Sequence, residues 1–144
     1  MKKIIALIII TIAISSCSDD KINYRNPYIP NYNFSIELNL DLPLYSDLKY
    51  TANGMLITLN GAGANGVIVF NAGSGNYKAF DASCPNQYAS SCSRMEVDGI
   101  AAVCPCDDIE YSLFTGLPMG NTEVEYPMKP YRVEVNGSIL RVYN

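Results

Sequence analysis

The chain has 144 residues, with 10 basic and 14 acidic side chains and a formal net charge of −4. It contains no histidine, which excludes Ser-His-Asp and Cys-His catalytic arrangements and removes the commonest general base near neutral pH. The acidic balance also disfavours nucleic acid and anionic lipid as electrostatic partners, because both attract basic surfaces.

The first sixteen residues have the pattern of a secretory signal. A positive start at residues 1–3 precedes an apolar run at residues 4–14, which is too short to span a bilayer. Two serines then precede Cys17, and this arrangement resembles the lipobox of bacterial lipoproteins, in which the cysteine is acylated and becomes the mature N-terminus. An ordinary cleaved signal with a chance cysteine is the alternative.

The mature chain would begin at Cys17 with a short acidic stretch. Removing residues 1–16 takes away Lys2 and Lys3, which leaves 8 basic against 14 acidic residues and a net charge of −6. A covalent lipid anchor on Cys17 would then supply the membrane attachment, since two or more acyl chains anchor stably. The resemblance implies an outer-membrane lipoprotein. The acidic residues 18–20 are similar to a surface-export signal, although a solvated linker would look the same.

Residues 17–33 are predicted to form an extended tether, because this stretch holds two prolines and four asparagines with no period of a helix or strand. One folded domain is predicted from residue 34 to residue 144. Its length of about 111 residues is sufficient for a single core.

Within this domain the apolar pattern predicts short strands and no helix. Residues 34–40 alternate between apolar and polar, as in a half-buried strand. Residues 42–48 contain a proline and are predicted to form a turn. Glycine and asparagine at residues 73–76 and at Asn136-Gly137 indicate hairpin turns. The fold class is therefore all-β, with further strands at residues 55–59, 66–71, 77–80, 131–135 and 138–143.

Four of the five cysteines lie in one region. Cys84-Pro85-Asn86 is followed, after seventeen residues, by Cys104-Pro105-Cys106-Asp107. This resembles the two cluster-binding loops of a Rieske iron–sulfur domain, which read Cys-x-His and Cys-x-x-His. The order of the strands on either side is also similar to that family. The resemblance implies a small antiparallel β-sandwich with a two-loop cysteine subdomain at about residues 82–117.

The chain departs from the Rieske pattern at both histidine positions, which hold Asn86 and Asp107. In a Rieske centre two histidines hold one of the two irons. Asp108 and Ile109 also stand where the family commonly has glycine and a serine that bonds a cluster sulfur. We therefore predict a degenerate 2Fe–2S site, at Cys84, Asn86, Cys104 and Asp107, that holds no cofactor.

Without Cys17, an even number of cysteines remains for an oxidising compartment, and the count alone allows three pairings. The resemblance implies that Cys92 pairs with Cys106, as in Rieske domains whose loops are pinned by a disulfide. It also implies that Cys84 and Cys104 converge at the positions of the two thiolate ligands. Without iron these two should bond to each other, provided that their Cα atoms lie within disulfide range.

Other uses of the cysteines stay open. The main alternative is an electron-transfer protein with a histidine-free [2Fe–2S] centre held by the cysteines. Zinc is disfavoured because Cys104 and Cys106 are spaced Cys-x-Cys rather than Cys-x-x-Cys. A thiol–disulfide module at these two residues is disfavoured because no helix N-terminus lowers a thiol pKa there.

The leading hypothesis is a non-catalytic interaction or accessory subunit at the outer membrane, anchored through Cys17. In Rieske proteins the two loops form the tip that docks on a redox partner. The resemblance therefore implies a partner-binding tip, where Tyr88 and Ile109 have the character of interface anchors. A tip kept only for its disulfides is the alternative, and the loop at residues 117–127 is the next binding candidate.

Overall fold

The computed structural model describes residues 25–144. The predicted signal and Cys17 lie outside these residues, so both the signal and the lipid anchor stay predictions. Within the described part of the chain, no helix has the length and apolar character needed to cross a membrane.

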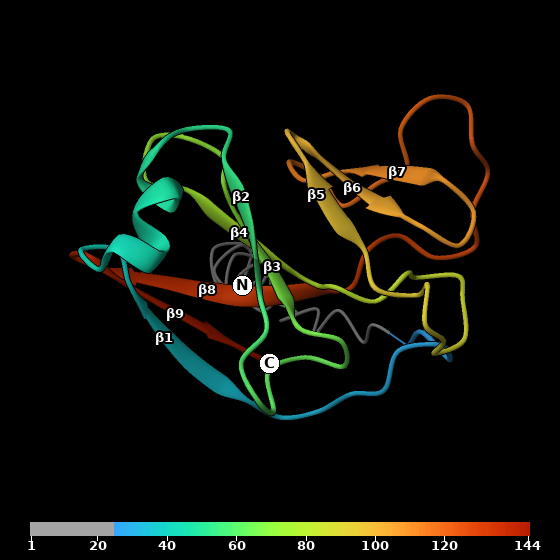
Figure 1. Ribbon diagram of the computed structural model, residues 1–144, viewed down its shortest axis with the longest axis horizontal. Helices are drawn as coiled ribbons and strands as arrows, with labels where there is room; N and C mark the ends of the chain where they lie inside the picture. Colours follow the sequence, from blue (N-terminus) through green and yellow to red (C-terminus); the bar gives the residue numbers. More distant parts are fainter. Residues whose placement is uncertain (1–24) are drawn as a thin grey trace, which may run out of the picture.

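The domain is built from two antiparallel sheets (Figure 1). The larger sheet has the strand order β1-β9-β8-β4-β3-β2, and the smaller sheet has the order β5-β6-β7. The loops that precede β5 and connect β6 to β7 contain Cys84, Cys92 and Cys106, and Cys104 ends β6. The predicted all-β class is confirmed. The strands of the larger sheet are β1 (Ser35–Asn39), β2 (Gly54–Ile57), β3 (Val67–Asn71), β4 (Tyr77–Asp81), β8 (Pro130–Asn136) and β9 (Ile139–Tyr143), and those of the smaller are β5 (Glu96–Asp98), β6 (Ala101–Cys104) and β7 (Ile109–Ser112).

Both predicted hairpins are present. Asn136 pairs with Ile139 across the β8–β9 turn, where Gly137 has a φ of +59°. The β3–β4 turn places Ser74 in the left-handed region between two glycines. In contrast, the segment predicted as a turn after β1 forms the 3₁₀ helix η2 (Pro43–Lys49). Proline at its start has the φ that a helix needs, and it lacks only an N–H that has no partner in the first turn.

Strand β3 separates two hydrophobic cores. Its five residues are all buried, and because neighbouring side chains point to opposite faces, Val67 and Val69 enter one core while Ile68 and Phe70 enter the other. The first core lies inside the curl of the larger sheet, with Leu38 and other aliphatic residues of β1 and β9. The second core joins this sheet to the cysteine subdomain, and its buried members include Cys84, Met95, Cys104, Tyr111 and Leu113.

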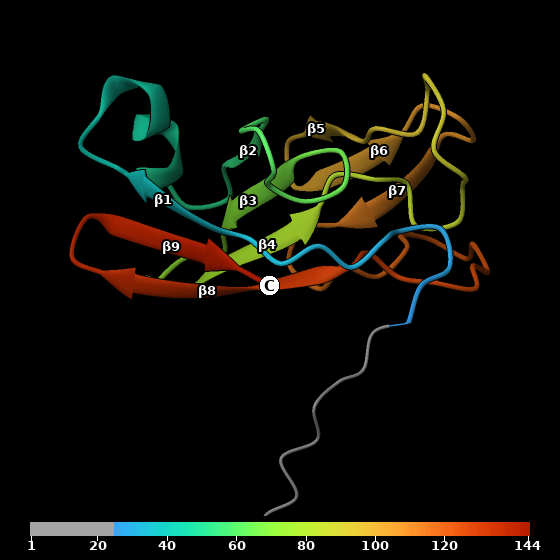
Figure 2. The ribbon, with the colours of Figure 1, turned by 90° about the horizontal axis from the view of Figure 1, so that it is seen from below.

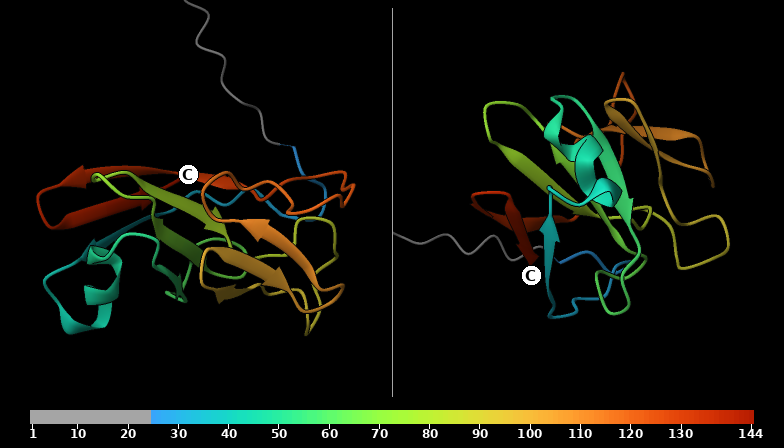
Figure 3. Two further views of the ribbon diagram at one scale, coloured as in Figure 1. Left: turned by 90° about the horizontal axis from the view of Figure 1, so that it is seen from above. Right: turned by 60° about the vertical axis from the view of Figure 1, so that its left-hand side comes forward.

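The folded part of the chain begins upstream of the predicted boundary. Residues 26–30, predicted as part of an extended tether, pack at the end of the molecule that carries the cysteine loops (Figure 2 and Figure 3). Asn26 and Ile29 are buried, and the Asn26 amide donates a hydrogen bond to the Pro85 carbonyl at 2.7 Å. The Lys129 ammonium donates to the Pro30 carbonyl at 3.0 Å.

Candidate functional site

Two loops carry the cysteines, and main-chain hydrogen bonds fix both. The first loop follows β4 and leads to β5, and it is closed where Cys84 N donates to the Ser93 carbonyl at 2.8 Å. The second is the tight turn at residues 105–108 between β6 and β7, where Asp108 N donates to the Cys104 carbonyl at 2.9 Å. The sheets therefore bring together two cysteine segments that are distant in the sequence.

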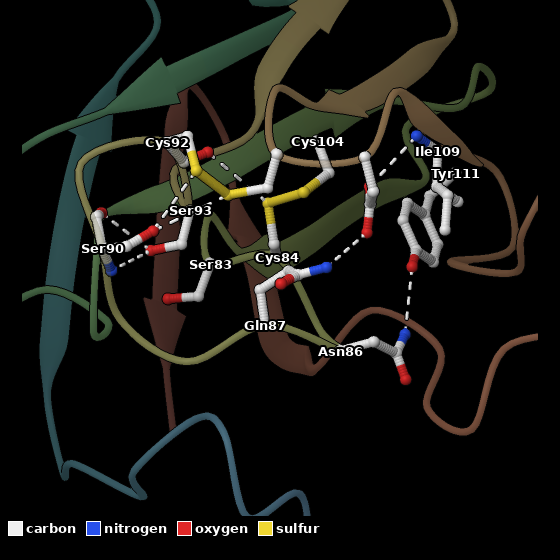
Figure 4. The surroundings of a disulfide bond; sticks show 12 residues. Ser83, Cys84, Asn86, Gln87, Ser90, Cys92, Ser93, Cys104, Ile109 and Tyr111 are labelled. Atoms are coloured by element: carbon white, nitrogen blue, oxygen red, sulfur yellow. Dashed lines mark hydrogen bonds between the residues drawn. A yellow bond between two sulfur atoms is a disulfide. The ribbon is translucent and has the colours of Figure 1, made fainter.

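Two disulfides connect these loops (Figure 4). Cys84 bonds to Cys104 with a Cα–Cα distance of 5.5 Å, and Cys92 bonds to Cys106 with a distance of 5.1 Å. Both distances lie in the normal disulfide range. The pairs are those that the resemblance implied. We call Cys84–Cys104 the inner disulfide, because both cysteines are almost fully buried, and Cys92–Cys106 the outer disulfide, because Cys92 is exposed.

Asn86 connects the first loop to the long loop that follows β7. Its amide nitrogen donates to the Tyr126 carbonyl at 2.8 Å and to the Tyr111 hydroxyl at 3.1 Å, while its amide oxygen accepts from Tyr126 N at 2.9 Å. The side chain thus pairs with a peptide group in the way that a neighbouring strand would. Burial raises the pKa of Tyr111, and the Asn86 hydrogen bond acts in the opposite direction.

Asp107 is also held by partners inside the protein. Its carboxylate accepts from the Gln87 amide at 2.7 Å and from Ile109 N at 3.1 Å, which closes the second loop on itself and on the first loop (Figure 4). The next residue, Asp108, has a φ of +56°. Asparagine and aspartate are the non-glycine residues that tolerate this left-handed conformation most readily. The second loop therefore places an aspartate, Asp108, in a left-handed conformation that glycine usually occupies.

No family model and no curated protein matches the sequence. Solved structures do match. One is the quaternary ammonium Rieske monooxygenase CntA, with a TM-score of 0.51 and 15% identity over 78% of this chain and 31% of that chain. The chain has a Rieske-like fold. Two further matches are a chain of the oxygenase–ferredoxin complex of carbazole 1,9a-dioxygenase (TM-score 0.48, 23% identity, 68% and 85% covered) and the ferredoxin of that dioxygenase from Nocardioides aromaticivorans (0.44, 20%, 67% and 90%).

While the Cys84–Cys104 disulfide is intact, the donor atoms of this Rieske-like site do not fit a Rieske centre. Such a centre takes two thiolates and two imidazoles. Here the Cys84 and Cys104 sulfurs are bonded to each other, and the other two positions hold an amide and a carboxylate that bond to protein groups. The sulfurs of Cys84, Cys104 and Cys106 nevertheless lie within 4.8 Å of one another. Reduced thiols at these positions would form a compact set of soft ligands.

The predicted binding tip is more covered than expected. Tyr88 is 75% exposed, as an interface anchor should be, but Ile109 is half-buried and packs against the second core. Tyr28 contacts both Tyr88 and Tyr126 edge-to-face, with ring centroids 4.8 and 6.0 Å apart. The tip therefore carries a cluster of three tyrosines, in which Tyr88 is exposed and Tyr28 and Tyr126 are half-buried, rather than a Tyr88–Ile109 pair.

Sequence reasoning missed a buried carboxylate at the base of the first loop. Asp81 is fully buried, and its oxygens accept from the Tyr131 hydroxyl, from Ala64 N at 2.7 Å and from Ser83 N at 2.7 Å. Burial and the Asp81 charge raise the pKa of Tyr131 far above its ordinary value. Burial lowers the pKa of Lys129, and the Asp81 charge opposes this shift. The one sequence signal is an aspartate that ends a strand directly before the loop.

Proposed function

We propose that this protein is an outer-membrane lipoprotein whose Rieske-like domain carries no iron–sulfur cluster and serves as a non-catalytic interaction or accessory subunit. One observation carries the proposal: all four positions where a Rieske centre would take its ligands are committed to bonds within the protein. Two are joined in the inner disulfide, and Asn86 and Asp107 hold the loops together. The lipobox-like sequence before Cys17 supports the anchor, and the acidic residues after it favour export to the cell surface.

The tip is the proposed binding surface. Loops on a rigid scaffold are the usual place for binding residues, and tyrosine is enriched at interface centres. The tyrosine cluster also lies near the start of the described chain, because Asn26 bonds to the first loop at Pro85. Arg25 lies eight positions after Cys17, and an extended chain spans at most about 3.6 Å per residue. A lipid on Cys17 would thus hold Arg25, whose neighbour Asn26 bonds to the first loop, within roughly 29 Å of the bilayer. The proposed partner is therefore a membrane-associated protein.

A pair of tyrosine variants tests the tip. Tyr88→Ser removes the exposed member of the cluster, and Tyr50→Ser removes a similarly exposed tyrosine at the C-terminal end of η2. This helix lies away from the cysteine loops (Figure 1). Ile109 is left intact because its packing would confound stability with binding. Partners crosslinked to the lipidated protein in membranes should be lost with Tyr88→Ser and kept with Tyr50→Ser. If both variants keep every partner, the tip is not the binding surface, and the loop at residues 117–127 is the next to test.

The second candidate function is electron transfer through a histidine-free [2Fe–2S] centre. The proximity of three cysteine sulfurs favours it, since these thiols could hold iron if both disulfides were open. It predicts bound iron and visible absorption, which the leading proposal does not.

A further inference from the structure

The two disulfides lie side by side in the cysteine subdomain. The Cys106 sulfur belongs to the outer disulfide, yet it lies within 4.8 Å of both sulfurs of the inner disulfide. Figure 4 shows the two sulfur pairs next to each other. A thiolate freed at Cys106 would therefore be placed beside a second disulfide. Exchange between thiolates and disulfides proceeds by direct attack of sulfur on sulfur.

The two disulfides differ in access to solvent. Cys84 and Cys104 are 0% and 1% exposed, whereas Cys92 is exposed and Cys106 is half-buried. Because exchange requires access to the attacked sulfur, an external thiolate would attack Cys92. Cys106 then becomes the leaving group, and it is the sulfur that faces the inner disulfide.

Ser90 is placed to assist the opening of the outer disulfide. Its hydroxyl lies 3.3 Å from the Cys92 sulfur and 3.7 Å from the Cys106 sulfur. The loop around Ser90 is fixed, because Ser90 N donates to the Ser93 hydroxyl at 2.8 Å and that hydroxyl donates to the Ser90 carbonyl at 3.0 Å. A hydroxyl held there can donate to a developing thiolate, and hydrogen bonds to ionised acceptors are stronger than neutral ones.

We propose that the two disulfides form a thiol–disulfide relay in which Cys106 passes electrons from an external dithiol to the inner disulfide. One thiolate of the dithiol attacks the Cys92 sulfur, breaks the Cys92–Cys106 bond and releases the Cys106 thiolate. The second thiol of the dithiol resolves this mixed disulfide and frees Cys92, so the dithiol becomes a disulfide. The Cys106 thiolate then bonds to Cys84 or Cys104 and displaces the other as a thiolate, which takes up a proton.

The relay goes beyond the proposed function and does not depend on the partner at the tip. Its net result is the transfer of two electrons and two protons from the dithiol, with one rearranged disulfide left in the protein. Failure of the relay would leave both disulfides as static crosslinks, and the accessory role would stand unchanged.

Two single substitutions provide a matched test. Cys92→Ser and Cys106→Ser each remove the same disulfide and release the same loop, so they differ in which sulfur is left free. In Cys92→Ser the free sulfur is Cys106, and after oxidative folding, non-reducing peptide mapping should find Cys106 bonded to Cys84 or Cys104. In Cys106→Ser the free Cys92 lies outside the group of three close sulfurs, and the Cys84–Cys104 bond should persist with Cys92 open to alkylation.

Two results would overturn the relay: an intact inner disulfide with a freely alkylated Cys106 in Cys92→Ser, or equal rearrangement in both variants.

If Cys92→Ser does not fold, the parent protein is treated with one equivalent of dithiothreitol and quenched by alkylation. The relay predicts label at Cys92 with Cys106 bonded to an inner cysteine, whereas label at both Cys92 and Cys106 contradicts it. Ser90→Ala should slow the first opening about fivefold, the effect of one lost hydrogen bond.

Discussion

The six-stranded sheet and the cysteine subdomain hold their shapes in different ways. The sheet has strands of up to seven residues and encloses an aliphatic first core. The subdomain has strands of three and four residues, and two disulfides and the Asn86 hydrogen bonds close its loops. Strands this short cannot bury enough apolar surface to be stable alone, so small units need crosslinks. The two regions therefore depend on different contacts: apolar packing in the larger sheet, and covalent crosslinks with side-chain hydrogen bonds in the cysteine subdomain.

Removing both disulfides should have the largest effect. The quadruple variant with Cys84 and Cys104 changed to Ala and Cys92 and Cys106 changed to Ser should lose more than about 4 kcal/mol of unfolding free energy, because single native disulfides contribute 2–5 kcal/mol. Urea unfolding measures the loss. Hydrogen exchange should show β5–β7 opening before β1 and β9. Equal protection of the two sheets from hydrogen exchange would show that the smaller sheet does not depend on its disulfides more than the larger sheet does.

A cavity in the first core should act on the whole domain. Leu140 in β9 is fully buried, and Leu140→Ala should cost about 3 kcal/mol through lost burial and an unfilled cavity. Both disulfides should still form, because the substitution lies far from the loops, and peptide mapping checks this. Loss of the disulfides in Leu140→Ala would show that the cysteine loops depend on the first core for their pairing.

Asn86 provides a smaller and more local test. Asn86→Ala removes three hydrogen bonds and leaves the Tyr126 peptide group without these partners, which should cost about 2 kcal/mol. Asn86→Asp is the matched control, because its carboxylate can still accept from Tyr126 N. Exchange of the Tyr126 amide should be fast in the Ala variant and slow in the Asp variant. Slow exchange in both would mean that other contacts hold the long loop.

The Asp81–Tyr131 pair should give the smallest effect, and it should depend on pH. The pKa of Tyr131 is raised in the folded state by burial and by Asp81. The contribution of Tyr131 to the free energy of unfolding is therefore complete below its ordinary pKa of 10.0, and it is lost as the pH rises above that value. Tyr131→Phe should cost about 1 kcal/mol at pH 7 and show a shallower loss of stability above pH 10. Parallel pH profiles for the two proteins would contradict this.

Much of the fold could be predicted because its signals are local. Alternation at β1 and the glycine- and asparagine-containing turns at Gly73 and Gly137 depend on neighbouring residues. The pairing of the cysteines could not be derived from their number, and it followed from the resemblance of two loops to a known pattern. The strands and turns could therefore be predicted from the residues themselves, whereas the disulfide pairs required the resemblance to a known family.

The remainder depends on contacts between distant residues. Strands β5 to β7 are too short for a clear period, and Asn26 meets Pro85 across 59 positions. Residues 26–30 have the composition of an extended linker. That composition does not distinguish a free linker from a segment that packs against the domain, so the packing could not be predicted. The burial of Ile109 was also not predictable, because its acidic neighbours suggest a surface turn. In the structure it is half-buried against the second core.

The proposal that the site holds no iron–sulfur cluster is tested most directly by iron analysis of the chain from Cys17 onward, folded under oxidising conditions with iron and sulfide supplied. We predict no stoichiometric iron, no visible absorption, and the Cys84–Cys104 and Cys92–Cys106 bonds in unreduced peptides. About two irons per chain together with visible absorption would show that the cysteines hold a [2Fe–2S] centre and would contradict the account.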